Sequence, residues 1–111
     1  MRNEVFSTSK GSVYQNDKTR KWEVDFAGKR ADFDYRCLLK LRDGIYRIDI
    51  EDKLLNHAAA ADVEIIFICA CDHTYVLSLL EVIALRELLE GTFAMLELNS
   101  IIHDALHRQL V

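Results

Sequence analysis

The sequence contains no proline, only four glycines and only three cysteines among its 111 residues. The absence of proline rules out a stiff proline-rich linker and argues against two separate domains. Three cysteines cannot all pair with one another, so we expect no secreted disulfide framework and instead a reducing, cytoplasmic location. The scattered glycines form neither a P-loop nor a GxGxxG motif, which removes the usual phosphate-binding loops.

Long apolar runs and an excess of positive charge are also missing. No run approaches the ~20 apolar residues of a membrane-spanning helix. The opening MRNEVFSTSKGS lacks the apolar core of a signal peptide. We therefore expect no membrane association. The formal net charge is −4, which is the wrong sign for a general nucleic-acid binder.

What the chain does contain fits one domain that spans residues 1–111. Half of the residues are hydrophobic and 29% are charged, which predicts a packed core. The charge is divided unevenly: residues 1–56 hold 12 Lys and Arg against 10 Asp and Glu, whereas residues 57–111 hold 2 against 8. The two halves could attract each other, within one chain or between two, but screening over ~8 Å makes this a bias on association and not a driving force.

The first half of the chain has the pattern of short strands followed by a helix. Alternating apolar and charged residues, with turn signals at Lys10-Gly11 and Ala27-Gly28, indicate strands buried on one face. Asp34 is a predicted N-cap. The helix after it either breaks at Asp43-Gly44 or gives way to a strand over Tyr46–Ile50. The predicted strands are Glu4–Ser7, Ser12–Gln15, Lys21–Phe26 and Arg30–Phe33.

The second half repeats this plan. Two strands, Glu64–Cys71 and Thr74–Leu77, flank a turn and precede a second predicted N-cap at Ser78. A helix follows to about Glu90, and Gly91 is expected to cap or kink it. Residues 92–110 then form a second helix, or the same helix continued past a bend.

The two halves overlay when the sequence is shifted by 44 residues, which suggests an internal repeat of about 12–55 and 64–108. Trp22 falls on Ile66, and the cap Asp34 falls on the cap Ser78. We therefore predict an α+β fold in which two ββα units form an antiparallel sheet of at least four strands, with helices packed on one face. The predicted core comprises Trp22, Val24, Phe26, Phe33, Leu38, Leu41, Ile66, Ile68, Leu77, Val82, Leu85, Leu89, Leu98, Ile101 and Ile102.

The stretches Gly11–Asn56 and Ile65–Leu106, the latter with LSLLEVIALRELLEG and AMLELNSIIHDAL, resemble a family of small bacterial domains of unknown function. The resemblance covers most of the chain and consists of hydrophobic spacing, so it implies no catalytic residue. Many members of that family carry a cysteine pair in the hairpin that here reads Tyr14-Gln15-Asn16-Asp17. Because this sequence has no cysteine there, a metal or redox role tied to that pair does not transfer.

Two groups of residues are weak candidates for metal binding. Cys69, Cys71 and His73 would share one face of a strand, but zinc sites favour two to four residues between paired cysteines, and here there is one. His103 and His107 are four residues apart on a predicted helix, at its polar border. Buried apolar cysteines and surface histidines are the simpler interpretation. We therefore expect no metal and no cofactor, and metal binding stays an alternative function.

Catalysis and nucleic-acid binding have less support. Cys37 begins a predicted helix, where a thiolate can be stabilised, but no histidine accompanies it locally and the sequence has no GxSxG motif. We expect no enzyme. Basic residues around the first-half hairpin could grip a single nucleic-acid strand, although acidic residues share those strands and Trp22 is in phase with the core. The basic residues are Lys18, Arg20, Lys21, Lys29 and Arg30.

The strand after residue 63 has no charge on its outward face. If Ile66 and Ile68 point inward, the outward set is Ile65, Phe67, Cys69 and Cys71. A strand that is apolar on both faces must be covered on both. We therefore predict a homodimer that buries Ile65 and Phe67. The predicted function is a small, cytoplasmic, non-enzymatic interaction module that self-associates, with a regulatory role as one option and single-stranded nucleic-acid binding as a further alternative.

Overall fold

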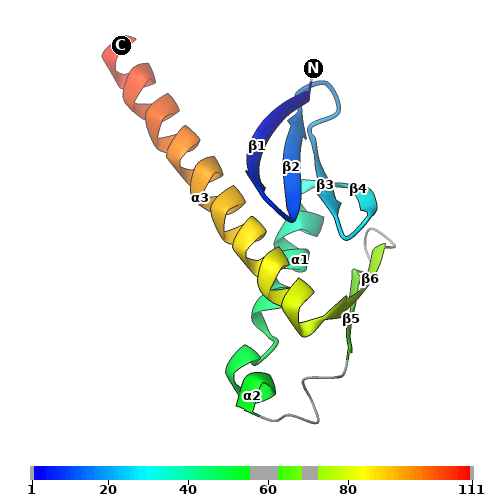
Figure 1. Cartoon of the computed structure of the whole chain (residues 1–111). Helices are drawn as coiled ribbons and strands as arrows, with labels where there is room; N and C mark the ends of the chain where they lie inside the picture. The colour runs from blue at the N-terminus through cyan, green and yellow to red at the C-terminus, as the bar shows by residue number, and fades with distance from the viewer. Residues whose placement is uncertain (1, 56–62, 69–72, 111) are drawn as a thin grey trace.

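The computed structural model describes residues 2–55, 63–68 and 73–110, with side chains undescribed at 53, 54, 63–68, 73 and 103–110. A four-stranded antiparallel sheet, a separate two-stranded hairpin and a long C-terminal helix make up the fold (Figure 1). The elements are β1 (Arg2–Thr8), β2 (Gly11–Asn16), β3 (Lys21–Phe26), β4 (Lys29–Phe33), α1 (Tyr35–Tyr46), α2 (Ile50–Leu55), β5 (Val63–Ile68), β6 (His73–Ser78) and α3 (Leu79–Leu110).

The four-stranded sheet is a simple meander in the order β1-β2-β3-β4. Its inner face is set by register: Val13 pairs with Val24, and Val24 pairs with Ala31. All three side chains are buried beneath the helices. Ala27 and Gly28 have φ values of 54° and 74°, the left-handed conformations that a tight two-residue hairpin turn requires.

The outer face of this sheet is charged and internally paired. Glu23 forms ion pairs with Arg2 at 3.1 Å and with Arg30 at 3.0 Å. The Arg2 guanidinium also lies 4.1 Å from the centre of the Tyr14 ring. The alternation predicted for these strands is therefore confirmed: apolar residues face the helices, and charged residues face outward.

Both predicted helix caps are present. The Asp34 carboxylate accepts a hydrogen bond from the Cys37 backbone N–H at 2.8 Å and so begins α1. The Ser78 hydroxyl accepts from the Glu81 N–H at 3.3 Å, and the Glu81 carboxylate accepts from the Ser78 N–H at 3.0 Å. This reciprocal pair is a capping box, which satisfies two N–H groups at the start of α3.

The α+β class and the antiparallel sheet with helices on one face are confirmed, but the internal duplication is not. All four strands of the larger sheet come from residues 2–33, and β5 and β6 form a sheet of their own. In β6, Tyr75 and Leu77 are 2% and 1% exposed, whereas Val76 is 59% exposed. The hairpin packs through its buried face against α1 and α3. Lys29 of β4 donates a hydrogen bond from Nζ to the Thr74 carbonyl of the hairpin at 2.9 Å.

The predicted break in the first helix is displaced. Helix α1 runs through Gly44 and ends at Tyr46, and the chain turns over residues 47–49 before α2. Ile45 is fully buried, which anchors the last turn. The Arg47 N–H closes that turn on the Asp43 carbonyl at 3.1 Å. The alternative strand over Tyr46–Ile50 is therefore wrong.

Helix α3 continues through Gly91, so the expected cap or kink there is wrong (Figure 1). The reason for a glycine at this position is the Phe6 ring of β1, which lies directly against the Gly91 backbone. A Cβ at residue 91 would overlap that ring. Gly91 thus costs some helix propensity and in return permits β1 and α3 to pack closely.

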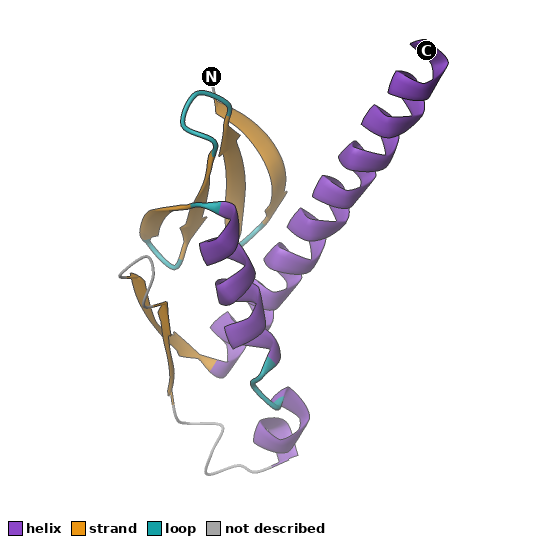
Figure 2. Cartoon of the chain, turned by 180° about the vertical axis from the view of Figure 1, so that it is seen from behind, coloured by secondary structure: helices purple, strands orange, loops and turns teal. Residues whose placement is uncertain are grey.

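Most of the predicted core is confirmed, and its C-terminal part is wrong. Seen from behind, α3 passes beside α1 and then extends beyond the sheet (Figure 2). Leu98, Ile101 and Ile102 belong to the C-terminal half of α3 and are 47%, 58% and 48% exposed. Trp22 is only partly buried, and the side chains of Ile66 and Ile68 are outside the described set. The confirmed core residues are Val24, Phe26, Phe33, Leu38, Leu41, Leu77, Val82, Leu85 and Leu89.

The contact between Phe6 and Gly91 predicts an unusual response to Gly91→Ala. Alanine should stabilise a helix interior by up to ~1 kcal/mol, but overpacking against Phe6 should cost about 1–3 kcal/mol. We expect a net loss in the free energy of unfolding, measured by urea denaturation. In a Phe6→Leu background the same substitution should become neutral or stabilising. Stabilisation of the otherwise unaltered protein by Gly91→Ala would contradict this packing.

Candidate functional site

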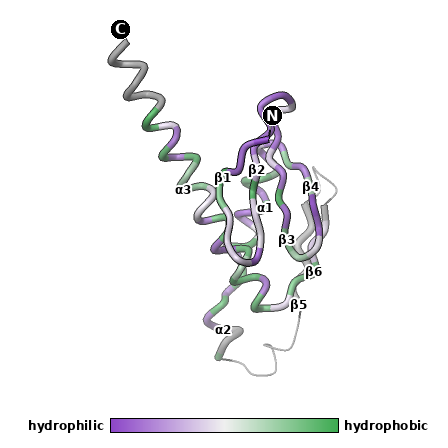
Figure 3. The backbone as a smooth tube through the Cα atoms, turned by 45° about the horizontal axis from the view of Figure 1, so that its top comes forward, coloured by the Kyte–Doolittle hydropathy of each residue, from purple (hydrophilic) through white to green (hydrophobic). Residues whose placement is uncertain are grey.

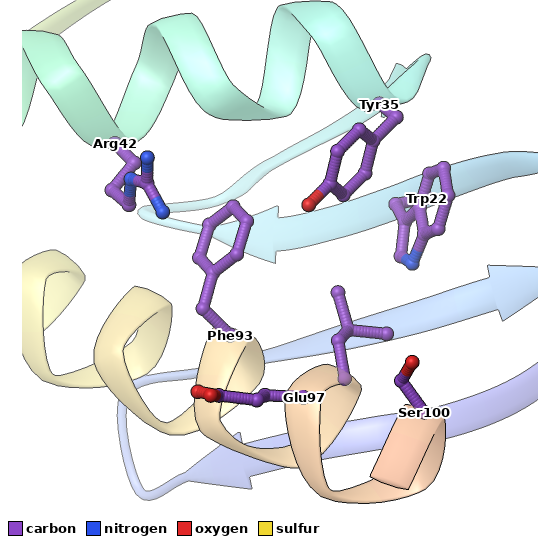
Figure 4. A pocket seen from close by; sticks show the side chains of 7 residues that line it. Trp22, Tyr35, Arg42, Phe93, Glu97 and Ser100 are labelled. Carbon is purple, nitrogen blue, oxygen red and sulfur yellow. The ribbon is translucent and has the colours of Figure 1, made fainter. Parts of the chain in front are cut away.

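A cavity of about 460 Å³ lies where β3, α1 and α3 meet (Figure 4). Pockets that hold small molecules commonly have volumes of ~300–1,000 Å³, so this one is large enough for a small ligand. Its walls combine three aromatic rings with one cation and one carboxylate. The lining residues are Trp22, Tyr35, Arg42, Phe93, Leu96, Glu97 and Ser100.

Simple periodicity brings these residues together. Trp22 lies on the inner face of β3, in phase with Val24 and Phe26. Tyr35 and Arg42 are seven residues apart and so lie on one side of α1. On α3 the lining residues are Phe93, Leu96, Glu97 and Ser100, which follow the i, i+3, i+4, i+7 spacing of one helix face.

The aromatic rings form a continuous wall. The Trp22 and Tyr35 ring centres are 5.5 Å apart, with their planes inclined at 52°. The Tyr35 and Phe93 ring centres are 6.4 Å apart, in an edge-on arrangement. The Arg42 guanidinium carbon lies 4.6 Å from the Phe93 ring centre, within the range of a cation–π contact. The cation is therefore held at the aromatic wall.

Hydrogen-bonding groups line the same space. The Trp22 indole nitrogen, Nε1, is buried and has no hydrogen-bond partner among the residues that the structure describes. Figure 4 shows this nitrogen turned toward Ser100, and the Tyr35 hydroxyl turned into the space between Trp22 and Phe93. An unpaired buried N–H typically costs ~1–3 kcal/mol, so an acceptor placed here would relieve a real penalty.

The candidate metal ligands are not brought together by anything that the structure describes. Cys69 and Cys71 lie outside the described residues. His73 belongs to β6, and His103 and His107 belong to α3, but their side chains are not described. Among the described residues, no group of three or more His, Cys, Asp or Glu side chains is arranged to hold a metal ion.

The predicted interface strand is placed by its backbone alone. In the hairpin, Ile65 pairs with Val76, and Phe67 pairs with Thr74. Val76 and Thr74 both have exposed side chains, and directly paired positions of antiparallel strands belong to the same face of a sheet.

The candidate nucleophile and the candidate nucleic-acid site both have groups that are already bonded within the protein. Cys37 is 2% exposed and disulfide-bonded, so it is not available as a nucleophilic thiolate. In the basic hairpin, Arg30 is paired with Glu23 and also with Asp25 at 3.6 Å. Lys29 donates to the Thr74 carbonyl and lies 4.7 Å from the Tyr75 ring centre. These two cations are already engaged within the protein.

Sequence reasoning singled out Trp22 but missed the rest of the cavity. Tyr35 and Arg42 belong to α1 and Phe93 belongs to α3, and no local motif joins the two helices to Trp22 on β3. The spacing of Phe93, Glu97 and Ser100 was the available signal, and it would have marked one helix face without revealing what lies opposite.

No family model, curated protein or solved structure matches this chain. The resemblance to small bacterial domains therefore stays an expectation. None of the helices in the described part of the chain is long and apolar enough to cross a membrane.

A second buried polar group lies in the hairpin. The Tyr75 hydroxyl is buried and has no hydrogen-bond partner among the described residues. Burial raises the pKa of Tyr75 from 10.0 to about 12, because the ionised phenolate would lose its hydration.

This pKa shift predicts a loss of stability at alkaline pH. Above pH ~10 the unfolded chain releases the Tyr75 proton while the folded chain keeps it, so the free energy of unfolding falls by up to ~1.4 kcal/mol per pH unit until pH ~12. Tyr75→Phe should remove this contribution and be neutral or stabilising at pH ~8, because the unpaired hydroxyl is lost. Urea unfolding at both ends of this range measures the difference. An identical alkaline slope in the two proteins would show that Tyr75 does not contribute.

Proposed function

We propose that the protein is a small, non-enzymatic interaction module that self-associates through the exposed end of α3. The observation that carries this proposal is the exposure of three large apolar side chains on the C-terminal half of α3, Leu98, Ile101 and Ile102. Figure 3 shows hydrophobic segments continuing along α3 beyond its contact with the sheet. Apolar side chains grouped at the end of a projecting helix are typical of an interface.

The sequence of α3 supports pairing with another helix. Leu88, Gly91, Met95, Leu98 and Ile102 follow the alternating three- and four-residue spacing of a coiled-coil seam. At the N-terminal end of this seam Leu88 is fully buried, and the Phe6 ring packs against Gly91. At the C-terminal end of the seam Leu98 and Ile102 are exposed. We name Leu98, Ile101 and Ile102 the α3 apolar stripe.

The molecule is more extended than a compact domain of its length, which is consistent with a partner molecule packing on this stripe. The radius of gyration is 15.8 Å, against about 13 Å for a compact domain of this length. A helix end without packing is marginally stable in water. A second copy supplies an identical stripe, and a two-fold axis across α3 would bring the two stripes together.

The β5–β6 hairpin is a second surface for this assembly. The homodimer that buries Ile65 and Phe67 stays a prediction, supported by their pairing with the exposed Thr74 and Val76. The cytoplasmic location and the regulatory role also stay predictions, and the disulfide at Cys37 is unusual for a reducing compartment. Metal binding and nucleic-acid binding have no described contact in their favour.

The proposal predicts that a charge in the α3 apolar stripe dissociates the assembly. Leu98→Lys and Ile102→Lys together should convert an oligomer into a monomer, because two identical stripes cannot bury four lysine ammonium groups without paying for their dehydration. Light scattering measures the mass, and circular dichroism checks that the fold is kept.

A matched control places the same charge on the same helix but off the stripe. Asn99→Lys should leave the mass unchanged. Phe67→Lys tests the hairpin surface separately, so the two surfaces are distinguished. An unaltered protein that is monomeric at high micromolar concentration would overturn the proposal.

A further inference from the structure

We propose that the cavity between β3, α1 and α3 is a binding site for a small planar carboxylate with an apolar, aromatic body. The site is independent of self-association. On α3 the cavity uses Phe93, Glu97 and Ser100, whereas the α3 apolar stripe uses Leu98, Ile101 and Ile102.

The aromatic wall of the cavity favours a ligand with a flat, apolar ring. Trp22, Tyr35 and Phe93 present three rings to one space, and Leu96 adds an aliphatic contact. Aromatic ligands gain from offset or edge-on contacts with such rings beyond the gain from buried area. A planar ring can meet the wall at several of these faces, whereas a branched aliphatic group of similar volume cannot.

The polar groups call for a hydrogen-bond acceptor with negative charge. Trp22 Nε1 and the Arg42 guanidinium can only donate hydrogen bonds, and the Tyr35 and Ser100 hydroxyls can donate as well. Arg42 keeps donors for a ligand because its ion pair with Asp43, at 3.6 Å, is long. A carboxylate matches this set, since it only accepts and is paired efficiently by arginine.

Trp22 Nε1 is the specific element of the site. The nitrogen is buried and has no hydrogen-bond partner among the described residues, so a ligand acceptor reaches it only when a neighbouring side chain moves. A hydrogen bond from Nε1 to the acceptor then offsets the free-energy cost of burying this N–H. Ligands without an acceptor at that point leave the penalty in place.

Glu97 limits the charge that the site accepts. Its side chain is exposed and forms part of the lining. A carboxylate at this position opposes an anionic ligand through solvent and favours a cationic one. Arg42 therefore favours an anionic ligand, whereas Glu97 favours a cationic one. Comparing ligands of different charge tests which residue dominates.

Three molecules of nearly equal size and planarity serve as probes. Benzoate is anionic, benzamide is neutral and benzamidine is cationic. Trp22 is the only tryptophan, so its indole N–H gives a single cross-peak in a nitrogen–proton correlation spectrum. We expect benzoate to move this peak saturably and downfield, benzamide to bind more weakly, and benzamidine not to bind.

Substitutions in the cavity identify the groups responsible. Arg42→Gln should weaken benzoate binding by about tenfold, the loss expected for a charge-assisted hydrogen bond, while benzamide binding changes little. Glu97→Gln should strengthen benzoate binding severalfold. Retained benzamide binding also shows that each variant still folds its cavity.

Arg86→Gln is the matched control. Arg86 lies 4.8 Å from the Tyr46 ring centre and beside the Glu90 carboxylate at 3.1 Å, so it reproduces the setting of Arg42 outside the cavity. Its substitution should leave benzoate affinity unchanged. Equal affinity for all three probes, preference for benzamidine, no saturable shift with benzoate, or an equal loss in Arg42→Gln and Arg86→Gln would each overturn the proposal.

Discussion

The buried face of the first half of α3 is the contact on which the other elements depend. Val82, Leu85, Leu88, Leu89 and Thr92 are all fully buried. Through this face α3 packs against β1, β2 and β6 as well as α1, so one helix joins two sheets that share no ladder hydrogen bonds. Burying each of its large aliphatic side chains contributes roughly 1.5–3 kcal/mol. Thr92 fits this apolar face because its hydroxyl donates to the Leu88 carbonyl at 2.7 Å.

The same helix separates two kinds of surface. One face of its N-terminal half is buried. Further along, α3 carries the cavity residues on one side and the α3 apolar stripe on another. This division follows from the helical period, which turns successive residues to different sides of α3. The environment of each side chain therefore depends on whether its side of the helix faces the other elements or faces away from them.

The extent to which the fold could be predicted follows from the range of the interactions. The caps at Asp34 and Ser78 and the alternating β3 strand are local, so three to six residues suffice to indicate them. The exposure of Leu98 and Ile102 depends on which face of α3 the rest of the protein covers, which no window of sequence contains. Gly91 shows the same limit, because its partner Phe6 is 85 positions away in the chain.

The candidate site was harder to predict than the fold. Its residues come from one strand and two helices, and each of them has an ordinary structural role when considered alone. Trp22 is a typical core residue by phase, and only the packing of α1 and α3 leaves its indole nitrogen buried without an acceptor among the residues that the structure describes. A site of this kind arises from how elements pack, so it becomes visible only after the packing is known.

The charged edge of the larger sheet has a consequence for the form that any assembly takes. Strand β4 is an edge strand and carries Lys29, Arg30 and Asp32, with Arg30 and Lys29 already bound to groups of the same chain. Charged residues on an edge oppose the addition of a strand from another molecule. Addition of a further strand is thus opposed at β4, so the four-stranded sheet is not extended from this edge.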